Sequence, residues 1–267
     1  YNNMGQYQWK KAVQGNVTQA NFESRIYNIA IDSQNNLHFI VGLSSGNHLD
    51  GLANVPVNSI QYYLVKLNTQ TQQFDDVLLL PIAGQMEPKN TRFVYDATSN
   101  IYYLSSIRES LMPFSYDNKP IINRTFLLAI RGFNSNIGTD GEEIWRREIY
   151  SQPTNGQSIQ ANRIYSLQID VNSDIYIGGN LYKSQNETNL KIYDPTDLTS
   201  VYNFTPGADW TIPFIAKLNS SGIVQWVQTT AAYNSNALTP GPRYGSGITL
   251  RGNEVAFGAQ GANEFWG

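Results

Sequence analysis

The stretch that decides the fold is Ile164-Tyr-Ser-Leu-Gln-Ile-Asp170-Val-Asn-Ser-Asp174-Ile-Tyr-Ile-Gly-Gly179. It holds a segment with alternating apolar residues, a short polar turn and a second apolar segment that begins at once, which is the pattern of a β-hairpin. The carboxylate of Asp170 can accept backbone N–H bonds and so stabilise the reversal of the chain. Two glycines then close the second segment, as expected where a strand bends away.

The same hairpin recurs along the chain. Its turn reads Asp32-Ser-Gln-Asn-Asn36 and Asp96-Ala-Thr-Ser-Asn100 in two further copies, and a degraded fourth copy has Leu250 in place of the Asp. A repeat with a period above 40 residues and strand-like content is typical of β-propellers and related β-arrays.

Two more strands complete each copy. The third strands are Tyr63-Leu-Val-Lys-Leu67, Phe126-Leu-Leu-Ala-Ile130 and Phe214-Ile-Ala-Lys-Leu218. The fourth strands carry Gly-x-x-x-Trp at Trp9, Trp145 and Trp226, and Phe74 takes the place of Trp in the remaining copy. Four antiparallel strands per repeat form the blade of a propeller. We therefore predict an all-β fold, a β-propeller-like array of four-stranded antiparallel blades, with about three and a half blades present.

The best copy resembles the repeat of the bacterial seven-bladed β-propeller (SBBP) family, in which "vDxxGNiYvtG" precedes "aFvaKlnxxGxxxW". The matching residues are 164–179 and 214–226, with Ser173 in place of the usual turn glycine. The resemblance implies a propeller of the kind found in secreted or surface proteins of diverse role, and it brings no catalytic residues with it. A fainter similarity to quinoprotein propellers rests on the Gly-x-x-x-Trp segment alone.

The repeat defines the expected domain organisation, a single domain over residues 1–267. Its blades are 1–13 (last strand only), 25–79, 89–149, 163–229 and 243–267 (first two strands). A closed propeller has about four to eight blades, and an incomplete ring leaves exposed strand edges. The phase of the repeat favours a piece of a larger protein over an open array whose edge is covered by a neighbouring subunit.

Composition excludes several classes of function. The net charge is −3 with a pI of about 5.4, which gives no reason to expect nucleic-acid binding. No apolar run is long enough to predict a membrane span. Cysteine is absent, so neither disulfides nor thiolate metal sites are expected. An extracellular protein, or one on the surface of a cell or particle, fits this composition, and so do many cytosolic proteins.

Long insertions gather on one expected face of the array, between the second and third strands: 43–61, 107–124 and 180–212. Such insertions commonly build a binding surface. The candidate interaction residues in the longest one are Tyr182, Tyr193, Tyr202, Phe204 and Trp210. Three interpretations remain open: a small core under the loop, a protein contact, or a sugar-stacking platform.

A basic residue precedes each turn by about seven positions: Arg25, Lys89, Arg163 and Arg243. These residues are expected near the start of the innermost strands, around the mouth of the propeller channel. A ring of this kind can hold an anionic ligand. The alternative, which the sequence favours, is that each one pairs with a carboxylate or carbonyl of the next blade.

No residue pattern indicates catalysis. Asp170-x-Asn172-x-Asp174 lacks the glycine and the final acid of a calcium loop, so these acids are expected to stabilise turns. His38 stands where Tyr102 and Tyr176 stand in other copies, which favours a structural role. The acidic pairs Asp75-Asp76 and Glu142-Glu143 are expected on solvated strand edges. No catalytic residue, cofactor site or metal site is therefore predicted.

The sequence thus predicts a non-catalytic structural or adhesive module that contacts other protein subunits or further blades. One alternative is a propeller enzyme (a hydrolase, lyase or quinoprotein) whose active site lies in missing blades. The other is a lectin-like propeller that binds glycans through its exposed aromatic residues.

Overall fold

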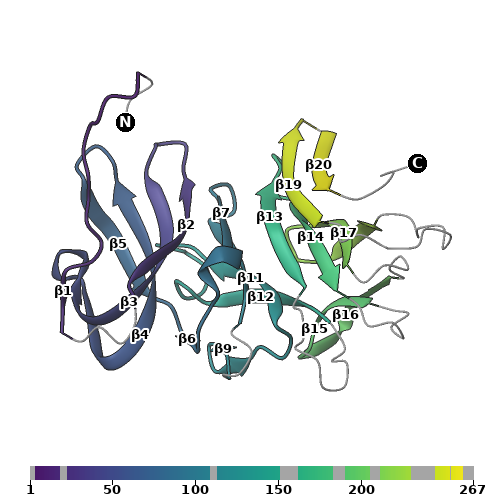
Figure 1. The fold of residues 1–267 in the computed structure, drawn as a ribbon, viewed down its shortest axis with the longest axis horizontal. Helices are drawn as coiled ribbons and strands as arrows, with labels where there is room; N and C mark the ends of the chain where they lie inside the picture. The colour runs from purple at the N-terminus through teal and green to yellow at the C-terminus, as the bar shows by residue number, and fades with distance from the viewer. Residues whose placement is uncertain are drawn as a thin grey trace. The chain divides into compact units, whose positions relative to one another are not determined.

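The computed structural model describes residues 4–18, 23–108, 113–150, 162–182, 190–204, 211–229, 244–252 and 254–260. Within these ranges the regular structure consists of antiparallel β-sheets and two 3₁₀ turns, without an α-helix (Figure 1). The all-β prediction is therefore confirmed. In this part of the chain no helix is long and apolar enough to cross a membrane. Two compact units, Tyr1–Leu80 and Pro81–Gly267, are described separately below.

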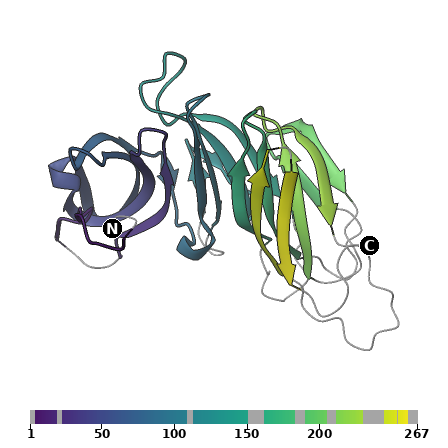
Figure 2. The same cartoon turned by 90° about the horizontal axis from the view of Figure 1, so that it is seen from above.

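The first unit contains one repeat, whose four long strands pair consecutively. They are β2 (Arg25–Ile31), β3 (Leu37–His48), β4 (Ala53–Asn68) and β5 (Gln73–Leu79), with the short β1 (Asn16–Val17) beside the end of β3 and the 3₁₀ turn η1 (Leu49–Gly51) between β3 and β4. The sheet curls strongly in the purple and blue part of Figure 2. Phe39, Val41, Val65 and Leu67 lie in its core.

The second unit contains two more four-stranded sets. The first is β7 (Arg92–Asp96), β8 (Ile101–Ile107), β11 (Thr125–Arg131) and β12 (Glu143–Ile149); the second is β13 (Arg163–Ile169), β14 (Ile175–Tyr182), β17 (Thr211–Leu218) and β18 (Val224–Thr229). A final hairpin pairs β19 (Tyr244–Arg251) with β20 (Glu254–Gln260). Shorter elements are β6 (Ile82–Ala83), η2 (Pro88–Asn90), β9 (Ser115–Tyr116), β10 (Lys119–Pro120), β15 (Leu190–Asp194) and β16 (Asp197–Phe204). We number the repeats one to four by their first long strands, β2, β7, β13 and β19.

The repeated turn has the expected chemistry. Oδ1 of Asp170 accepts hydrogen bonds from the backbone N–H groups of Asn172 and Asp174, both at 2.9 Å. Oδ1 of Asp32 does the same for Gln34 and Asn36, at 2.9 and 2.8 Å. Ser173 has a φ of 62°, in the left-handed region that glycine adopts without steric cost. The predicted turn-stabilising role of these acids is confirmed.

Strand pairing corrects two alignments between repeats. Trp145 lies opposite Ala129 and Trp226 opposite Lys217, but the residue opposite Lys66 is Asp76 rather than Phe74. The prediction that Phe74 replaces Trp is therefore wrong. Tyr95 pairs with Tyr102 while the matching Ile169 pairs with Ile175, so Tyr103, not Tyr102, corresponds to Tyr176 and His38. A one-residue shift of this kind moves each side chain to the opposite face of the sheet.

The expected strand within residues 1–13 is a further error, because the described residues 4–13 form no strand. Trp9 instead packs its partly buried ring against the core of the first repeat. The described residues around Trp9 are thus placed by its packing against the first repeat and not by pairing within a strand.

Successive sheets of the second unit pack in a constant order. We define the front face of the third repeat by Leu167, Ile177 and Ala216, and its back face by Tyr176, Ile215 and Trp226. The front face packs against the back face of the second repeat, which carries Tyr103, Leu127, Ala129 and Trp145. The back face packs against Ile248, Leu250 and Phe257, the front face of the fourth repeat. Front therefore meets back at both junctions.

Candidate interaction site

Strand β12 carries charged side chains in the interior of the second unit. Its sequence is Glu143-Ile-Trp-Arg-Arg-Glu-Ile149, and successive side chains point to opposite faces of the sheet. Trp145 and Arg147 therefore share one face, while Arg146 and Glu148 share the other. Arg146, Arg147 and Glu148 are all buried. An unpaired buried charge costs free energy, so each of these side chains needs a partner. The partners show which parts of the fold β12 holds in place.

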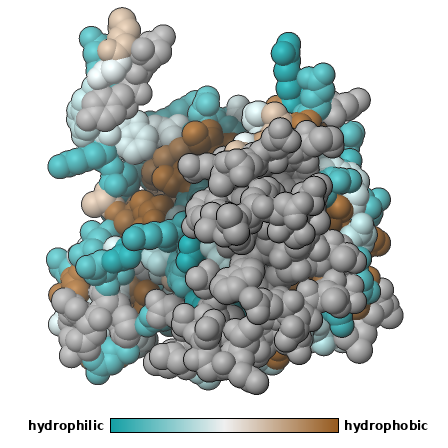
Figure 3. Space-filling view, turned by 45° about the vertical axis from the view of Figure 1, so that its right-hand side comes forward, coloured by the Kyte–Doolittle hydropathy of each residue, from teal (hydrophilic) through white to brown (hydrophobic). Residues whose placement is uncertain are grey.

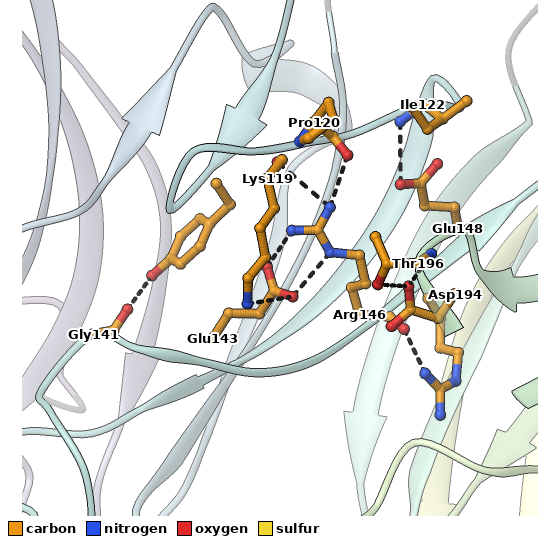
Figure 4. Close-up of polar contacts among 11 residues, drawn as sticks. Lys119, Pro120, Ile122, Gly141, Glu143, Arg146, Glu148, Asp194 and Thr196 are labelled. Atoms are coloured by element: carbon orange, nitrogen blue, oxygen red, sulfur yellow. Dashed lines mark hydrogen bonds and ion pairs between the residues drawn. The ribbon is translucent and has the colours of Figure 1, made fainter. Parts of the chain in front are cut away.

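Arg146 is fully buried and holds the insertion of the second repeat (Figure 4). Its guanidinium forms an ion pair with Glu143, and Nη1 donates a hydrogen bond to the carbonyl oxygen of Pro120, at 2.8 Å. Nearby, the hydroxyl of Tyr116 donates to the carbonyl oxygen of Gly141, at 2.5 Å. The prediction that Glu142 and Glu143 lie on a solvated edge is wrong for Glu143, since its side chain is buried beside Arg146.

Glu148 binds the other end of the same insertion. Its carboxylate accepts hydrogen bonds from the backbone N–H of Ile122 at 3.2 Å and of Asn123 at 2.5 Å, and from Nδ2 of Asn123 at 2.9 Å. Burial raises the pKa of Glu148, and these hydrogen bonds oppose that rise. Arg146 and Glu148 thus fix the backbone of residues 120–123 from one face of a single strand.

The opposite face of β12 holds the next repeat. Nε1 of Trp145 donates to the carbonyl oxygen of Ser220 at 2.9 Å, and Nε of Arg147 donates to that of Gly222 at 2.6 Å. The guanidinium of Arg147 also lies over the ring of Trp145, 5.4 Å from its centroid. Since Ser220 and Gly222 belong to the turn between β17 and β18, β12 connects the second repeat with the third.

The insertions add a second set of pairings. The end of β3 pairs with β1, β9 pairs with β6, and β15 pairs with the end of β12. The insertions of the second and third repeats thus reach the segment at or just after the fourth strand of the preceding repeat, and the end of β3 reaches the short segment that precedes β2. The expected long connections are thus strand extensions or hairpins where they are described. Edges of β12 and of two shorter segments are covered in this way.

Three of the five predicted interaction residues have described side chains. Tyr193 lies opposite Glu148 in the β12–β15 pairing, and its hydroxyl accepts a hydrogen bond from Nδ2 of Asn123 at 3.0 Å. Tyr202 lies opposite Ile192 on the neighbouring strand, and Tyr182 ends β14. All three side chains are partly buried. Phe204 ends β16 with its side chain outside the described part, and Trp210 lies outside the described residues.

The predicted basic residues have different surroundings. Arg25 is exposed on β2 and forms an ion pair with Glu23. Lys89 lies in η2, where its carbonyl oxygen accepts a hydrogen bond from Arg92 at 3.1 Å. Arg163 begins β13 and donates to the hydroxyl of Tyr165 at 3.4 Å, an interaction that raises its pKa. Arg243 lies outside the described residues.

Arg163 has basic neighbours that the sequence did not single out. Arg124 lies 3.2 Å from Glu87 in an ion pair. Burial lowers the pKa of Arg124, Glu87 raises it, and the nearby Arg108 and Arg163 lower it further. Arg108 directly follows β8 and Arg124 directly precedes β11, and the backbone N–H of Arg108 donates a hydrogen bond to the carbonyl oxygen of Arg124 at 2.9 Å. The predicted pairing of these two strands could have indicated that the two arginines are neighbours. Among the described residues, no group of three or more His, Cys, Asp or Glu side chains is arranged to hold a metal ion.

No protein-family model and no curated protein matches this chain. The resemblance to the SBBP repeat rests on residues 164–179 and 214–226. The contacts of β12 and the packing of the repeats are therefore the features that bear on function.

Proposed function

We propose that this chain is a non-catalytic structural module, a β-propeller-like array outside the cell or on a particle surface, that joins protein subunits. The constant front-to-back order of the sheets supports the array, because blades of a propeller stack in this way around their axis. Repeat units that bury their faces only against neighbours form extended interaction surfaces. The module contacts further blades of the same kind or other subunits.

The observation that carries the proposal is the use of buried charge on β12. Arg146, Arg147 and Glu148 direct their hydrogen bonds to backbone groups of an insertion and of the next repeat. Charge-assisted bonds of this kind are stronger than neutral ones and fix geometry. The buried charged side chains of β12 thus hold an insertion and the next repeat in fixed positions. A rigid structural element needs contacts of this kind between its repeats.

The position of β16 is a further argument for an interaction role. It is the outermost strand of the six-stranded sheet β16-β15-β12-β11-β8-β7. An outer strand offers backbone donors and acceptors to another chain, and strand addition at such an edge is a common mode of protein recognition. Asn203 of this strand is exposed.

Sedimentation velocity over a range of protein concentrations tests the proposal. A joining module is expected to associate reversibly at micromolar concentrations, with a sedimentation coefficient that rises with concentration. A chain that sediments as a single species of 30.0 kDa at all concentrations contradicts it. Raising the ionic strength at fixed protein concentration then separates association through apolar faces, which persists, from association through surface charges, which weakens.

A further inference from the structure

Strand β2 presents three isoleucines at the surface of the first unit. Ile26, Ile29 and Ile31 are 43%, 46% and 66% exposed. Ile29 lies opposite Phe39 and Ile31 opposite Leu37, so these side chains share the face that carries the core residues of the sheet. The pair Leu167 and Ile177, which defines the front face of the third repeat, corresponds to the pair Ile29 and Phe39. The isoleucines of β2 therefore lie on the front face of the first repeat. Hydrophobic (brown) side chains also form patches among the hydrophilic (teal) ones on the side of the molecule drawn in Figure 3.

The same position is covered in the third repeat. All three hairpins have an irregularity at the same place in the first strand, between Ile26 and Asn28, Ile164 and Ser166, and Gly245 and Gly247. Ile29, Leu167 and Ile248 each come directly after the second residue of this irregularity, so the three residues occupy corresponding positions. Leu167 is only 3% exposed, because it belongs to the core that contains the back face of the second repeat.

In the fourth repeat the corresponding residue meets a glycine. Ile248 is buried, and its Cδ1 lies 2.8 Å from the place where a Cβ on Gly178 would stand. The ring of Phe257 lies 3.0 Å from the same point. The missing side chain of Gly178 thus creates the space on the back face of the third repeat into which the front-face isoleucine packs.

The back face of the fourth repeat carries a glycine at the position that corresponds to Gly178. Gly258 follows Phe257 as Gly178 follows Ile177, and it lies opposite Gly247 in the hairpin. Thr249 pairs with Ala256 on the same face. Thr249, Ala256 and Gly258 are exposed. The chain therefore has three exposed isoleucines on β2, at the edge of a front face whose central residues are buried. On the back face of the fourth repeat the exposed side chains beside Gly258 are small, and the charged pair Arg251 and Glu254 lies at the turn.

We propose that these two faces bind one another between two copies of the chain. Ile29 of one copy packs onto Gly258 of the next, as Ile248 packs onto Gly178 within one copy. The contact continues the front-to-back order of the second unit into a neighbouring molecule. It is heterologous, so it generates a ring or an open array rather than a two-fold dimer. This inference rests on the proposed function and identifies its partner as a second copy.

Cross-linking of single-cysteine variants tests the geometry, since the natural chain has no cysteine. Packed sheets lie about 10 Å apart, beyond the reach of a disulfide, so a short bis-maleimide reagent is used. A mixture of the Ile29→Cys and Ala256→Cys proteins is expected to give a cross-linked dimer that neither protein gives alone. Val171→Cys, on a turn and 88% exposed, replaces Ile29→Cys in the control mixture.

Three results overturn the inference. They are no dimer in the mixture, an equal yield in the control mixture, or self-cross-linking of Ile29→Cys, which indicates a symmetric front-to-front contact. In sedimentation experiments, Ile29→Asp or Ile31→Asp is expected to weaken association at least about tenfold, because a carboxylate is buried against an apolar face. Ile137→Asp, at a position 73% exposed, is the control.

The two proposals fail differently. If wild-type association is present but the Asp variants at Ile29 and Ile31 leave it unchanged, the chain still joins subunits and only the assigned contact is wrong. If the wild type never associates, the joining function is wrong as well. Circular dichroism of each variant confirms that it folds, which is expected since both isoleucines are substantially exposed.

Discussion

Trp145 donates a hydrogen bond from Nε1 to the carbonyl oxygen of Ser220, 2.9 Å away and 75 residues later in the sequence. The acceptor belongs to the turn between the last two strands of the next repeat. Arg147, two residues along the same strand, donates to Gly222 in that turn. The tryptophan of the Gly-x-x-x-Trp segment therefore does more than fill the core, because it holds a defined point of the neighbouring sheet.

Removing only the donor of Trp145 is expected to weaken this junction. Trp145→Phe keeps an aromatic ring but leaves the carbonyl of Ser220 without the indole hydrogen bond, which costs about 1–2 kcal/mol of unfolding free energy. Urea denaturation followed by circular dichroism measures the loss. Val171→Ala, at a turn position that is 88% exposed, is expected to stay within about 0.5 kcal/mol of wild type. Equal stability of the two variants would show that the indole N–H contributes nothing.

Gly222 gives a second test of the same junction. Its φ is +75°, and a Cβ on it would stand 2.6 Å from the ring of Trp145. Gly222→Ala is therefore expected to suffer both the left-handed backbone cost and a clash with the ring. Gly252 has a φ of +59° with no atom within 4 Å of the added Cβ, so Gly252→Ala carries only the backbone cost, about 1–2 kcal/mol.

The difference between the two alanine variants isolates the contact with Trp145. Gly222→Ala is expected to lower the midpoint of thermal unfolding by several degrees more than Gly252→Ala does, since overpacking costs about 1–3 kcal/mol. Similar midpoints for the two would mean that the turn moves away from Trp145 without loss.

The sequence predicted local structure well because the repeated turn signals its own geometry. Asp32, Asp96 and Asp170 each accept backbone N–H bonds, as their spacing from the following Asn or Asp indicated. Residues 25–31 and 37–42 likewise pair as the alternating apolar pattern predicted. These features depend on neighbours within a few residues, which a sequence pattern contains.

Register and long-range partners were not predictable in the same way. The shift that puts Tyr103 at the place of Tyr176 arises from one residue of difference in the turn pairing, which the alignment of turn residues conceals. Glu143 was expected on a solvated edge, and no sequence pattern indicated a role for Arg146 or Arg147, because the backbone carbonyls that these arginines bind carry no sequence signal. Pairing of β15 with β12 joins residues far apart in the sequence, such as Glu148 and Tyr193, which periodicity alone does not reveal.

Arg146 tests the importance of buried charge. Arg146→Met leaves the buried Glu143 with only the more distant Lys119, at 3.9 Å, and removes a donor to the carbonyl of Pro120. The unfolding free energy is therefore expected to fall by about 3–5 kcal/mol. The double variant Arg146→Met/Glu143→Leu removes both charges and is expected to recover part of that loss.

Arg131 and Glu142 provide the matched control, because they form a more exposed ion pair, at 3.1 Å, between the end of β11 and the residue that precedes β12. Arg131→Met is expected to cost at most about 1 kcal/mol. If Arg146→Met costs no more than Arg131→Met in the same urea titration, the buried pair does not hold the insertion, and the argument from β12 to a rigid joining module loses its basis.

Asp32 links the first turn to pH. Burial pushes its pKa upward, but hydrogen bonds from Asn36, His38 and Gln34 outweigh this and lower the pKa to about 2 from its ordinary value of 3.8. A carboxyl whose folded pKa lies below its unfolded pKa stabilises the fold above the unfolded value, and that stability is lost as the pH falls through the folded value. The unfolding free energy of wild type relative to Asp32→Asn is therefore expected to be constant above about pH 5 and to shrink between about pH 4 and pH 2. Urea titrations at several pH values measure this difference, with Asp50→Asn, an exposed acid of the same unit, as the control. A difference that stays constant down to pH 2 would mean that Asp32 titrates like an ordinary carboxyl, and that the turn is held by its backbone rather than by the charge.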